Sequence, residues 1–481
     1  MNETATPPEA PAAPPKKGDE LELTVESLAF GGQGIARHHG LVVFLDKGKS
    51  LPGSTVRARI TKKRKGFAEA RVLEVLKASP DAVEAPCAHF GVCGGCTTQN
   101  LTYEAQLAQK QAQVADLFGR MGHFTDLEIQ PIIGCKETFN YRNKMEFTWS
   151  NRAWLLGDED PIPDRALGLH VPGRYDKVLD IEQCHLQHLV AGEVYTWIKA
   201  HTSSLEPYDI KAHSGFLRHL VIRTAEPEAG KIEIMVNFVT SREDPAALKP
   251  LAEGLAEKFP QVVSVVNNIN TRRAAVAYGE WEVLLHGRPS LTMQLRGLTF
   301  EVSANAFFQT NSAQAELLLE QVEAACALTG EEVVYDLFCG TGAIALMLAR
   351  QAKEVAGFES VTPAVDDATR NAMVNEIFNV RFFLADLGAK YFTHNLQRLL
   401  KQVPRPDIVV ADPPRAGFHP KLVEEIADLG PRKVVYVSCN PATQVRDVVL
   451  LAEAGYRPTW VQPVDMFPHT PHIENICILE R

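Results

Sequence analysis

The chain has 481 residues, too many for a single hydrophobic core, so roughly two to four domains are expected. Nine cysteines, an odd number in a long chain, favour reduced thiols, metal ligands or catalysis over a disulfide framework. The net charge of −10 argues against a protein that coats nucleic acid indiscriminately, while a local basic patch remains compatible with RNA binding.

The N-terminal stretch, residues 1–16, holds five prolines in a low-complexity sequence, which predicts a disordered tail. It lacks the apolar core of a signal peptide, and no apolar run in the chain approaches the roughly 20 residues that span a bilayer. We therefore expect a cytoplasmic protein that contacts no membrane.

Residues 17–77 show short alternating stretches separated by Gly31-Gly32 and Pro52-Gly53, which predicts a small OB-like β-barrel. The third stretch runs into six basic residues and an aromatic one, a composition that suits phosphate neutralisation and base stacking. These residues are Arg57, Arg59, Lys62, Lys63, Arg64, Lys65 and Phe67. A solvated hairpin tip explains this segment equally well by itself.

The same segment resembles a TRAM domain, an RNA-binding barrel. The resemblance rests on Phe30-Gly31-Gly32-Gln33-Gly34, on Val43-Phe44 and on Leu51-Pro52-Gly53. It favours RNA over the solvated tip.

Three thiols, Cys87, Cys93 and Cys96, follow on a glycine-rich loop that lets the backbone wrap closely around an inorganic centre. Cys184 is the best candidate for a fourth ligand, because Cys339 and Cys439 fall in motifs with other expected roles. The spacing leaves [4Fe–4S] and zinc open, since zinc sites more often use paired C-x2-C units. The spacing also differs from the C-x3-C-x2-C of radical enzymes, so we interpret the site as structural or RNA-positioning.

Residues 78–305 alternate β-like stretches with polar turns, which predicts a mainly β central domain that includes the cysteine site. From 306 to 481 the strand and helix patterns alternate, which predicts a Rossmann-like α/β domain with a parallel sheet.

This α/β region contains a nucleotide-binding pattern. An apolar strand ends at Asp336-Leu337 and is followed by the tight turn Phe338-Cys339-Gly340-Thr341-Gly342, whose glycines let the backbone approach a ligand. The next strand ends at Glu359, where a ribose hydroxyl acceptor is expected, and Asp386 ends the one after it. The series fits an S-adenosylmethionine site better than a NAD site, which usually shows G-x-G-x-x-G; an α/β fold without a nucleotide remains the alternative.

The next buried strand delivers Asp412-Pro413-Pro414-Arg415 to the carboxyl edge of the sheet, where such folds bind ligands. Arg415 replaces the aromatic residue that would stack a base in amino-methyltransferases, and Cys439 follows the next strand, so carbon chemistry is favoured. Carbon 5 of uracil is a poor nucleophile until a thiolate adds at carbon 6. Cys439 is then the predicted nucleophile and Glu474 the predicted base that removes the carbon 5 proton.

Four motifs resemble those of the RNA 5-methyluridine methyltransferases, and the resemblance covers nearly the whole chain. They are Asp336-Leu337-Phe338-Cys339-Gly340, Asp412-Pro413-Pro414-Arg415, Ser438-Cys439-Asn440-Pro441 and His472-Ile473-Glu474. The TRAM segment and the cysteine quartet look like the bacterial 23S ribosomal RNA (uracil-5-)-methyltransferases that carry [4Fe–4S].

The resemblance implies a role for each site residue. Cys439 is the nucleophile and Glu474 the base. The residues implied to contact S-adenosylmethionine are Gln309, Phe338, Glu359 and Asp386, with Asp412 between it and uracil. The implied cluster ligands are Cys87, Cys93, Cys96 and Cys184.

The implied partner is RNA, with 23S rRNA favoured, and no obligate protein partner is predicted. Two alternatives stay open at this point: the same chemistry on a tRNA uridine, and a methyltransferase-like protein that binds RNA without catalysis.

Overall fold

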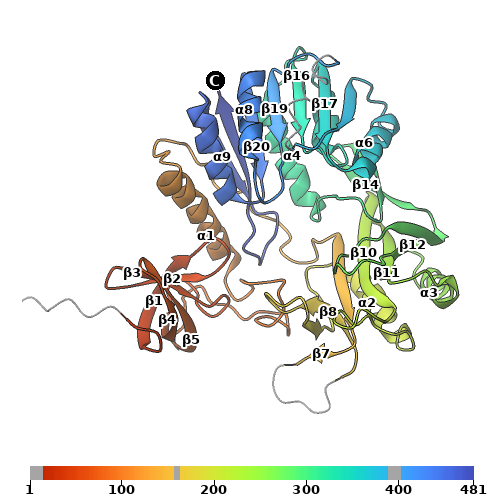
Figure 1. The fold of residues 1–481 in the computed structure, drawn as a ribbon, viewed down its shortest axis with the longest axis horizontal. Helices are drawn as coiled ribbons and strands as arrows, with labels where there is room; N and C mark the ends of the chain where they lie inside the picture. Colours follow the sequence, from red (N-terminus) through yellow and green to blue (C-terminus); the bar gives the residue numbers. More distant parts are fainter. Residues whose placement is uncertain (1–14, 156–162, 388–401) are drawn as a thin grey trace, which may run out of the picture. The chain divides into compact units, whose positions relative to one another are not determined.

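The computed structural model describes residues 15–155, 163–387 and 402–481, so the predicted tail lies almost entirely outside the described residues. The described chain forms two compact units, shown in Figure 1. Unit 1 holds residues up to 91 together with 96–113 and 469–471, and unit 2 holds 92–95, 114–468 and 472–481. No helix in the described parts is both long and apolar enough to cross a membrane. The domain limits expected at residues 77 and 305 stay predictions.

Unit 1 contains a closed five-stranded barrel with the strand order β1-β2-β3-β5-β4, which confirms the small β-barrel expected from the sequence. Its strands are β1 (Glu20–Leu28), β2 (Gly34–His38), β3 (Leu41–Leu45), β4 (Thr55–Lys63) and β5 (Phe67–Lys77). Alternation along β4 buries Val56, Ala58 and Ile60 and leaves Arg57 and Arg59 exposed, because neighbouring side chains of a strand point to opposite faces. Most of helix α1 (Tyr103–Asp116) also belongs to this unit.

Unit 2 contains an eight-stranded, mostly antiparallel sheet with the order β13-β12-β11-β10-β6-β8-β9-β7. Its strands are β6 (Lys144–Ser150), β7 (Ala153–Trp154), β8 (Ala166–His170), β9 (Val178–Asp180), β10 (Leu217–Glu228), β11 (Lys231–Thr240), β12 (Val262–Ile269) and β13 (Trp281–Gly287). Helices α2 (Leu189–His201) and α3 (Pro245–Lys258) share a hydrophobic core with this sheet. A π-helical turn, η1 (Leu117–Met121), precedes it in the chain.

A second hydrophobic core joins this sheet to the remainder of unit 2. Ala225, Met235 and Val266 of the large sheet lie in one cluster with Phe300 of the hairpin β14 (Ser290–Leu295) and β15 (Leu298–Ser303). The same cluster continues into the C-terminal sheet as far as Ile476. The hairpin therefore lies within one continuous apolar layer of unit 2.

The C-terminal sheet has seven strands in the order β18-β17-β16-β19-β20-β22-β21. The strands are β16 (Val333–Leu337), β17 (Glu354–Glu359), β18 (Val380–Leu384), β19 (Ile408–Ala411), β20 (Lys433–Ser438), β21 (Arg457–Val464) and β22 (Glu474–Glu480). The helices are α4 (Ser312–Cys326), α5 (Ala343–Ala349), α6 (Thr362–Val374), α8 (Pro420–Leu429) and α9 (Pro441–Glu453).

The first five strands of this sheet pair in parallel, and β22 runs antiparallel between β20 and β21. The carboxyl ends of β16 to β20 therefore meet at one edge, and the amino end of β22 reaches the same edge. The order of the strands reverses between β16 and β19, which is the position where open α/β sheets bind their ligands.

Candidate active site

The strand pairing brings Cys439 and Glu474 together. Ser438, the last residue of β20, pairs with Asn475 of β22, and in an antiparallel pair the next residues in register are Cys439 and Glu474. Glu474 is buried and Cys439 is partly exposed. Asp412 follows β19, which lies beside β20, so the predicted nucleophile, the predicted base and this carboxylate share one edge.

The environment of the Cys439 thiol disfavours its charged form. Burial raises the pKa of Cys439 to about 11, and the charges of Glu474 and Asp412 add to this effect. The Arg415 guanidinium acts in the opposite direction, through its charge and a hydrogen bond to the thiol. Helix α9 begins just beyond Cys439, and a helix amino terminus also favours a thiolate.

The two carboxyl groups beside the thiol are also perturbed. Burial raises the pKa of Glu474 well above its ordinary value, the charge of Asp412 raises it further, and Arg415 lowers it. Burial raises the pKa of Asp412 to about 7. Carboxyl groups perturbed in this way are common at functional sites.

Hydrogen bonds fix the loop of Arg415 against the turn of Cys439. The Asn440 amide and the Thr443 hydroxyl donate to the backbone carbonyl of Arg415, at 3.0 and 3.1 Å. The Arg415 guanidinium lies 3.3 Å from Nδ1 of His472, two residues before Glu474. Arg415 thus lies near both the thiol and the approach to β22, a role that the sequence motif did not reveal.

Near Cys439, a buried amide pair holds β20 and β22 in register. The Gln444 side chain on α9 donates to the carbonyls of Tyr436 and Asn475, at 2.8 and 3.1 Å. It accepts a hydrogen bond from Nδ2 of Asn475 at 2.6 Å. Because Asn475 follows Glu474 directly, this pair supports the position of the predicted base.

Three residues predicted to bind S-adenosylmethionine lie at the neighbouring strand ends. Phe338 follows β16 with a positive φ of 65°, and its ring stacks parallel to Phe418 at 6.4 Å. Glu359 ends β17, where its carboxylate accepts hydrogen bonds from the amides of Gly340 at 3.2 Å and Val361 at 2.9 Å. Asp386, which is exposed, lies just beyond β18, whose residue Leu384 pairs with Glu359.

Gln309, the fourth residue predicted to contact S-adenosylmethionine, lies outside this sheet. It precedes Asn311, the N-cap of α4, and its carbonyl accepts a hydrogen bond from the Asn143 amide at 2.9 Å. The structure therefore shows how its backbone is held and does not group it with the strand ends.

Asp336, inside the nucleotide-binding motif, is completely buried beneath this edge. Burial raises the pKa of Asp336 well above its ordinary value, and the charges of Asp412 and Glu359 raise it further. Burial, together with the charges of Asp336 and Glu359, raises the pKa of the neighbouring Cys339 thiol. The resulting concentration of carboxyl groups suits a cationic ligand such as a sulfonium.

The four cysteines predicted to bind a cluster are all partly exposed. Cys87 and Cys96 belong to unit 1, and Cys93 and Cys184 belong to unit 2. Within residues 15–155, 163–387 and 402–481, no group of three or more His, Cys, Asp or Glu side chains is arranged to hold a metal ion. The [4Fe–4S] site stays a prediction, and no chemical step is assigned to it.

The six basic residues of the barrel, which we call the basic strip, offer less positive charge to RNA than the sequence suggested. Three of its six cations pair with carboxylates on neighbouring strands: Arg57 with Glu74 at 2.7 Å, Arg59 with Glu20 at 2.7 Å, and Lys62 with Glu69 at 2.8 Å. The other three, Lys63, Arg64 and Lys65, lie where β4 turns into β5. Phe67 opens β5, and its ring packs edge-on against Phe44 at 5.7 Å. The positive charge available to phosphates therefore concentrates at this turn.

Comparison with known proteins agrees with the fold. The tRNA (uracil-5-)-methyltransferase family matches residues 285–481, and the TRAM domain family matches residues 14–73. An uncharacterized RNA methyltransferase of Chlorobaculum tepidum is 42% identical over 475 residues, which cover 97% of each chain. Another, of Porphyromonas gingivalis, is 40% identical over 474 residues, covering 95% of this chain and 99% of the relative.

A solved structure is similar over the same extent. The Pyrococcus abyssi tRNA (uracil-54, C5)-methyltransferase, in complex with S-adenosyl-L-homocysteine, superposes with a TM-score of 0.69 and 27% identity. The similarity covers 95% of this chain and all of that one. The C-terminal sheet is therefore a methyltransferase fold, and the chain belongs to the RNA uracil-5-methyltransferase family.

Proposed function

We propose that this protein transfers a methyl group from S-adenosylmethionine to carbon 5 of a uridine in RNA. The observation that carries the proposal is the meeting of Cys439, Glu474 and Arg415 at the edge of the C-terminal sheet. Carbon 5 of uracil becomes a nucleophile after a thiolate adds to carbon 6, so a thiol and a base at one site suit this reaction.

In the proposal, the methyl donor binds at the strand ends beside the thiol. When bound, S-adenosylmethionine supplies the electrophilic methyl group. Glu359 is positioned by backbone amides to accept hydrogen bonds from ribose hydroxyls, and Phe338 offers an apolar surface. In the proposal Gln309 and Asp386 complete the contacts to the donor, while Asp412 lies between the donor and uracil.

The chain's own groups make and break the bonds at carbons 5 and 6, and the Cys439 thiol proton passes to solvent as the thiolate forms. Arg415 and the amino terminus of α9 stabilise the Cys439 thiolate, which forms a bond to carbon 6. Carbon 5 then takes the methyl group. The Glu474 carboxylate removes the carbon 5 proton, and the electron pair of that bond restores the double bond as the carbon–sulfur bond breaks.

The raised pKa of Glu474 suits this role. A carboxylate whose pKa is raised by burial is a stronger base than an ordinary one and takes up a proton more readily. The raised pKa of Cys439 means that the thiol predominates at neutral pH, so the thiolate must form as the substrate binds or with the help of Arg415.

Two RNA classes remain as substrates. The sequence resemblance favours 23S rRNA, whereas the similar structure from Pyrococcus abyssi is that of a tRNA methyltransferase. The TRAM barrel, with cations and an aromatic pair at the β4–β5 turn, supports RNA contact in either case. The non-catalytic alternative is disfavoured because thiol and base are both present at one edge.

Radiolabelled S-adenosylmethionine, incubated separately with 23S rRNA and tRNA transcripts, tests the proposal. We expect label in 5-methyluridine of the 23S transcript, mapped by nuclease digestion and nucleoside chromatography. Label confined to tRNA would keep the chemistry and change the substrate. Absence of label from both RNAs, with folded protein that binds S-adenosylmethionine, would contradict the proposal.

Substitution of the thiol and of the base should have opposite effects on a covalent complex. Cys439→Ala should abolish both methyl transfer and any protein–RNA adduct, because no bond to carbon 6 can form. Glu474→Gln should accumulate a methylated adduct, because the proton is no longer removed. Denaturing gels with labelled RNA measure both results, and an adduct in Cys439→Ala would remove this thiol from the mechanism.

Asp412→Asn should stabilise the protein at alkaline pH while impairing methyl transfer. A carboxyl pKa raised to about 7 makes the folded state bind more protons than the unfolded chain, so stability falls as pH rises from about 4 to 7. Removing the carboxyl should increase the free energy of unfolding at pH 8, by at most about 4 kcal/mol. Denaturant unfolding at pH 5 and pH 8 measures the gain in the free energy of unfolding. An equal gain at both pH values would count against the raised pKa of Asp412.

The proposal includes a [4Fe–4S] cluster on Cys87, Cys93, Cys96 and Cys184, since four thiolates suit such a cluster. Protein purified without oxygen should then contain iron and acid-labile sulfide in equal amounts. Cys93→Ala should lose both, whereas Cys326→Ala, which alters a buried thiol of α4, should retain them. Protein that contains zinc but no sulfide, or that contains neither iron nor zinc, would rule the cluster out.

A further inference from the structure

Helix α9 holds the loop of residues 415–418, which we call the Arg415 loop. Two hydrogen bonds to the Arg415 carbonyl were described above. Further along the loop, the Arg446 guanidinium on α9 donates to two more backbone carbonyls, at 2.9 and 3.2 Å. Loop and helix both lie in unit 2. The backbone of the loop is therefore tied to the helix that begins just beyond Cys439.

Asp447, the next residue of α9, joins this loop to the strand of the nucleophile. Its Oδ2 accepts hydrogen bonds from the Phe418 amide and from the Tyr436 hydroxyl of β20, both at 2.7 Å. Its Oδ1 accepts one from the Arg446 guanidinium at 2.8 Å. Asp447 is completely buried, so these charge-assisted hydrogen bonds are shielded from water. One carboxylate thus links β20 to the Arg415 loop.

The two neighbours of this carboxylate suit such a link. Burial and the charge of Asp447 raise the pKa of Tyr436, so its hydroxyl keeps the proton that it donates. Gly417 of the loop has a positive φ of 75°, and a Cβ atom at this position would lie 2.3 Å from Oδ2 of Asp447. Loop and carboxylate therefore approach so closely that only glycine fits at this position.

The Arg415 side chain is exposed, so the place of its guanidinium depends on how its backbone is held. A long exposed side chain loses conformational entropy when it keeps one geometry. Burial and the charges of Glu474 and Asp412 raise the pKa of the Cys439 thiol, whereas Arg415 lowers it. Because both a charge interaction and a hydrogen bond weaken with distance, displacement of the loop would remove this opposing effect.

We propose that Asp447 is a positioning residue for the nucleophile: by binding the Arg415 loop to β20, it keeps the guanidinium where it stabilises the Cys439 thiolate. The inference rests on the proposed function, in which this thiolate adds to carbon 6 of uracil. It gives a buried carboxylate of α9 a part in the first chemical step, through the loop that it holds and not through its own charge.

The direction of the effect on the thiol separates these two routes. Loss of a nearby negative charge would by itself lower the pKa of Cys439, whereas loss of the Arg415 position raises it. We expect Asp447→Ala to raise this pKa, so that alkylation of Cys439 at pH 8 slows about three- to tenfold. Iodoacetamide labelling of the full-length protein over a series of pH values, with mass spectrometry of the peptide that contains Cys439, measures the rate.

Three further variants test the contact. Asp447→Asn keeps an acceptor for the Phe418 amide, so its alkylation rate should stay close to that of the wild type. Gly417→Ala keeps the carboxylate and forces the loop away from it, so the rate should fall as in Asp447→Ala. If Asp447 acts through Arg415, the double variant Arg415→Met with Asp447→Ala should react as fast as Arg415→Met alone.

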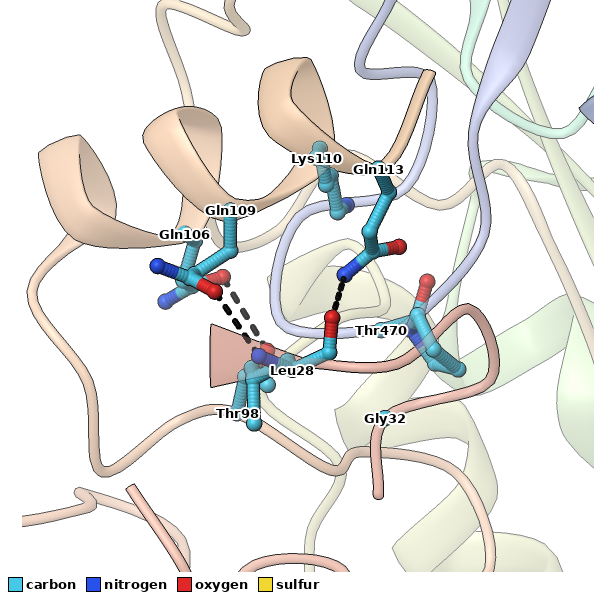
Figure 2. Close-up of a pocket in the computed structure, with 9 residues that line it drawn as sticks. Leu28, Gly32, Thr98, Gln106, Gln109, Lys110, Gln113 and Thr470 are labelled. Atoms are coloured by element: carbon cyan, nitrogen blue, oxygen red, sulfur yellow. Dashed lines mark hydrogen bonds between the residues drawn. The ribbon is translucent and has the colours of Figure 1, made fainter. Parts of the chain in front are cut away.

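Gln109→Leu is the control for loss of a side-chain hydrogen bond in another part of the chain. Figure 2 shows Gln109 and Gln106 on one side of α1, among the residues that line a small pocket of unit 1. Gln109 accepts a hydrogen bond from the Leu28 amide at 2.8 Å, and its loss should leave the alkylation rate unchanged. Gln106 is less suitable, because it accepts a hydrogen bond from the His469 amide at 2.9 Å. That amide lies in the turn of residues 469–471, the His469 turn.

An unchanged or faster alkylation in folded Asp447→Ala would overturn the inference, as would an equal slowing in Gln109→Leu. A double variant slower than Arg415→Met would also overturn it, because Asp447 would then act by another route. If Asp447→Ala does not fold, Gly417→Ala decides in the same way. The labelling needs neither RNA nor S-adenosylmethionine. Methyl transfer by Cys439→Ala would contradict the proposed function, whereas an unchanged labelling rate contradicts only the role of Asp447, so the two failures are distinguishable.

Discussion

The antiparallel insertion of β22 between β20 and β21 is the constraint on which the site depends. Five parallel strands bring only their carboxyl ends to the edge of the sheet, and those ends supply the Cys439 thiol and several carboxyls. A strand of opposite direction brings its amino end to the same edge, so Glu474 lies in register with Cys439. The Gln444–Asn475 amide pair stabilises this register. Its hydrogen bonds satisfy buried polar groups, which would destabilise the fold if they were left unpaired.

The edge so formed concentrates carboxyl groups. Asp336, Asp412 and Glu474 are each perturbed by burial, and Asp412 raises the pKa of the other two. Arg415 is the cation that opposes this effect at both Cys439 and Glu474. Such an arrangement costs folding free energy, as sites built for proton transfer and cationic ligands commonly do, and the continuous apolar cluster of unit 2 offsets that cost.

The segment between β21 and β22 is held along its length by side chains from distant parts of the chain. Asn311, the N-cap of α4, and Gln314 of α4 donate to the carbonyls of Met466 and Asp465, at 3.0 and 2.8 Å. Within unit 1, Gln106 holds the His469 turn. The segment that precedes β22 is thus held by anchors that are far away in sequence.

The sequence by itself determined the elements whose signals are local. Alternation and glycine turns predicted the barrel, and buried strands ending in short turns predicted which residues, Asp412 and Cys439 among them, would lie at strand ends. Tertiary structure alone decided that β22 runs antiparallel beside β20, that Arg415 faces the thiol, and that half of the basic strip is neutralised by glutamates. It also gave Gln106, an ordinary polar residue of a helix, its place at the His469 turn. Pairing of strands, burial and charge neighbours arise between residues distant in the chain, so no local pattern of residue types encodes them.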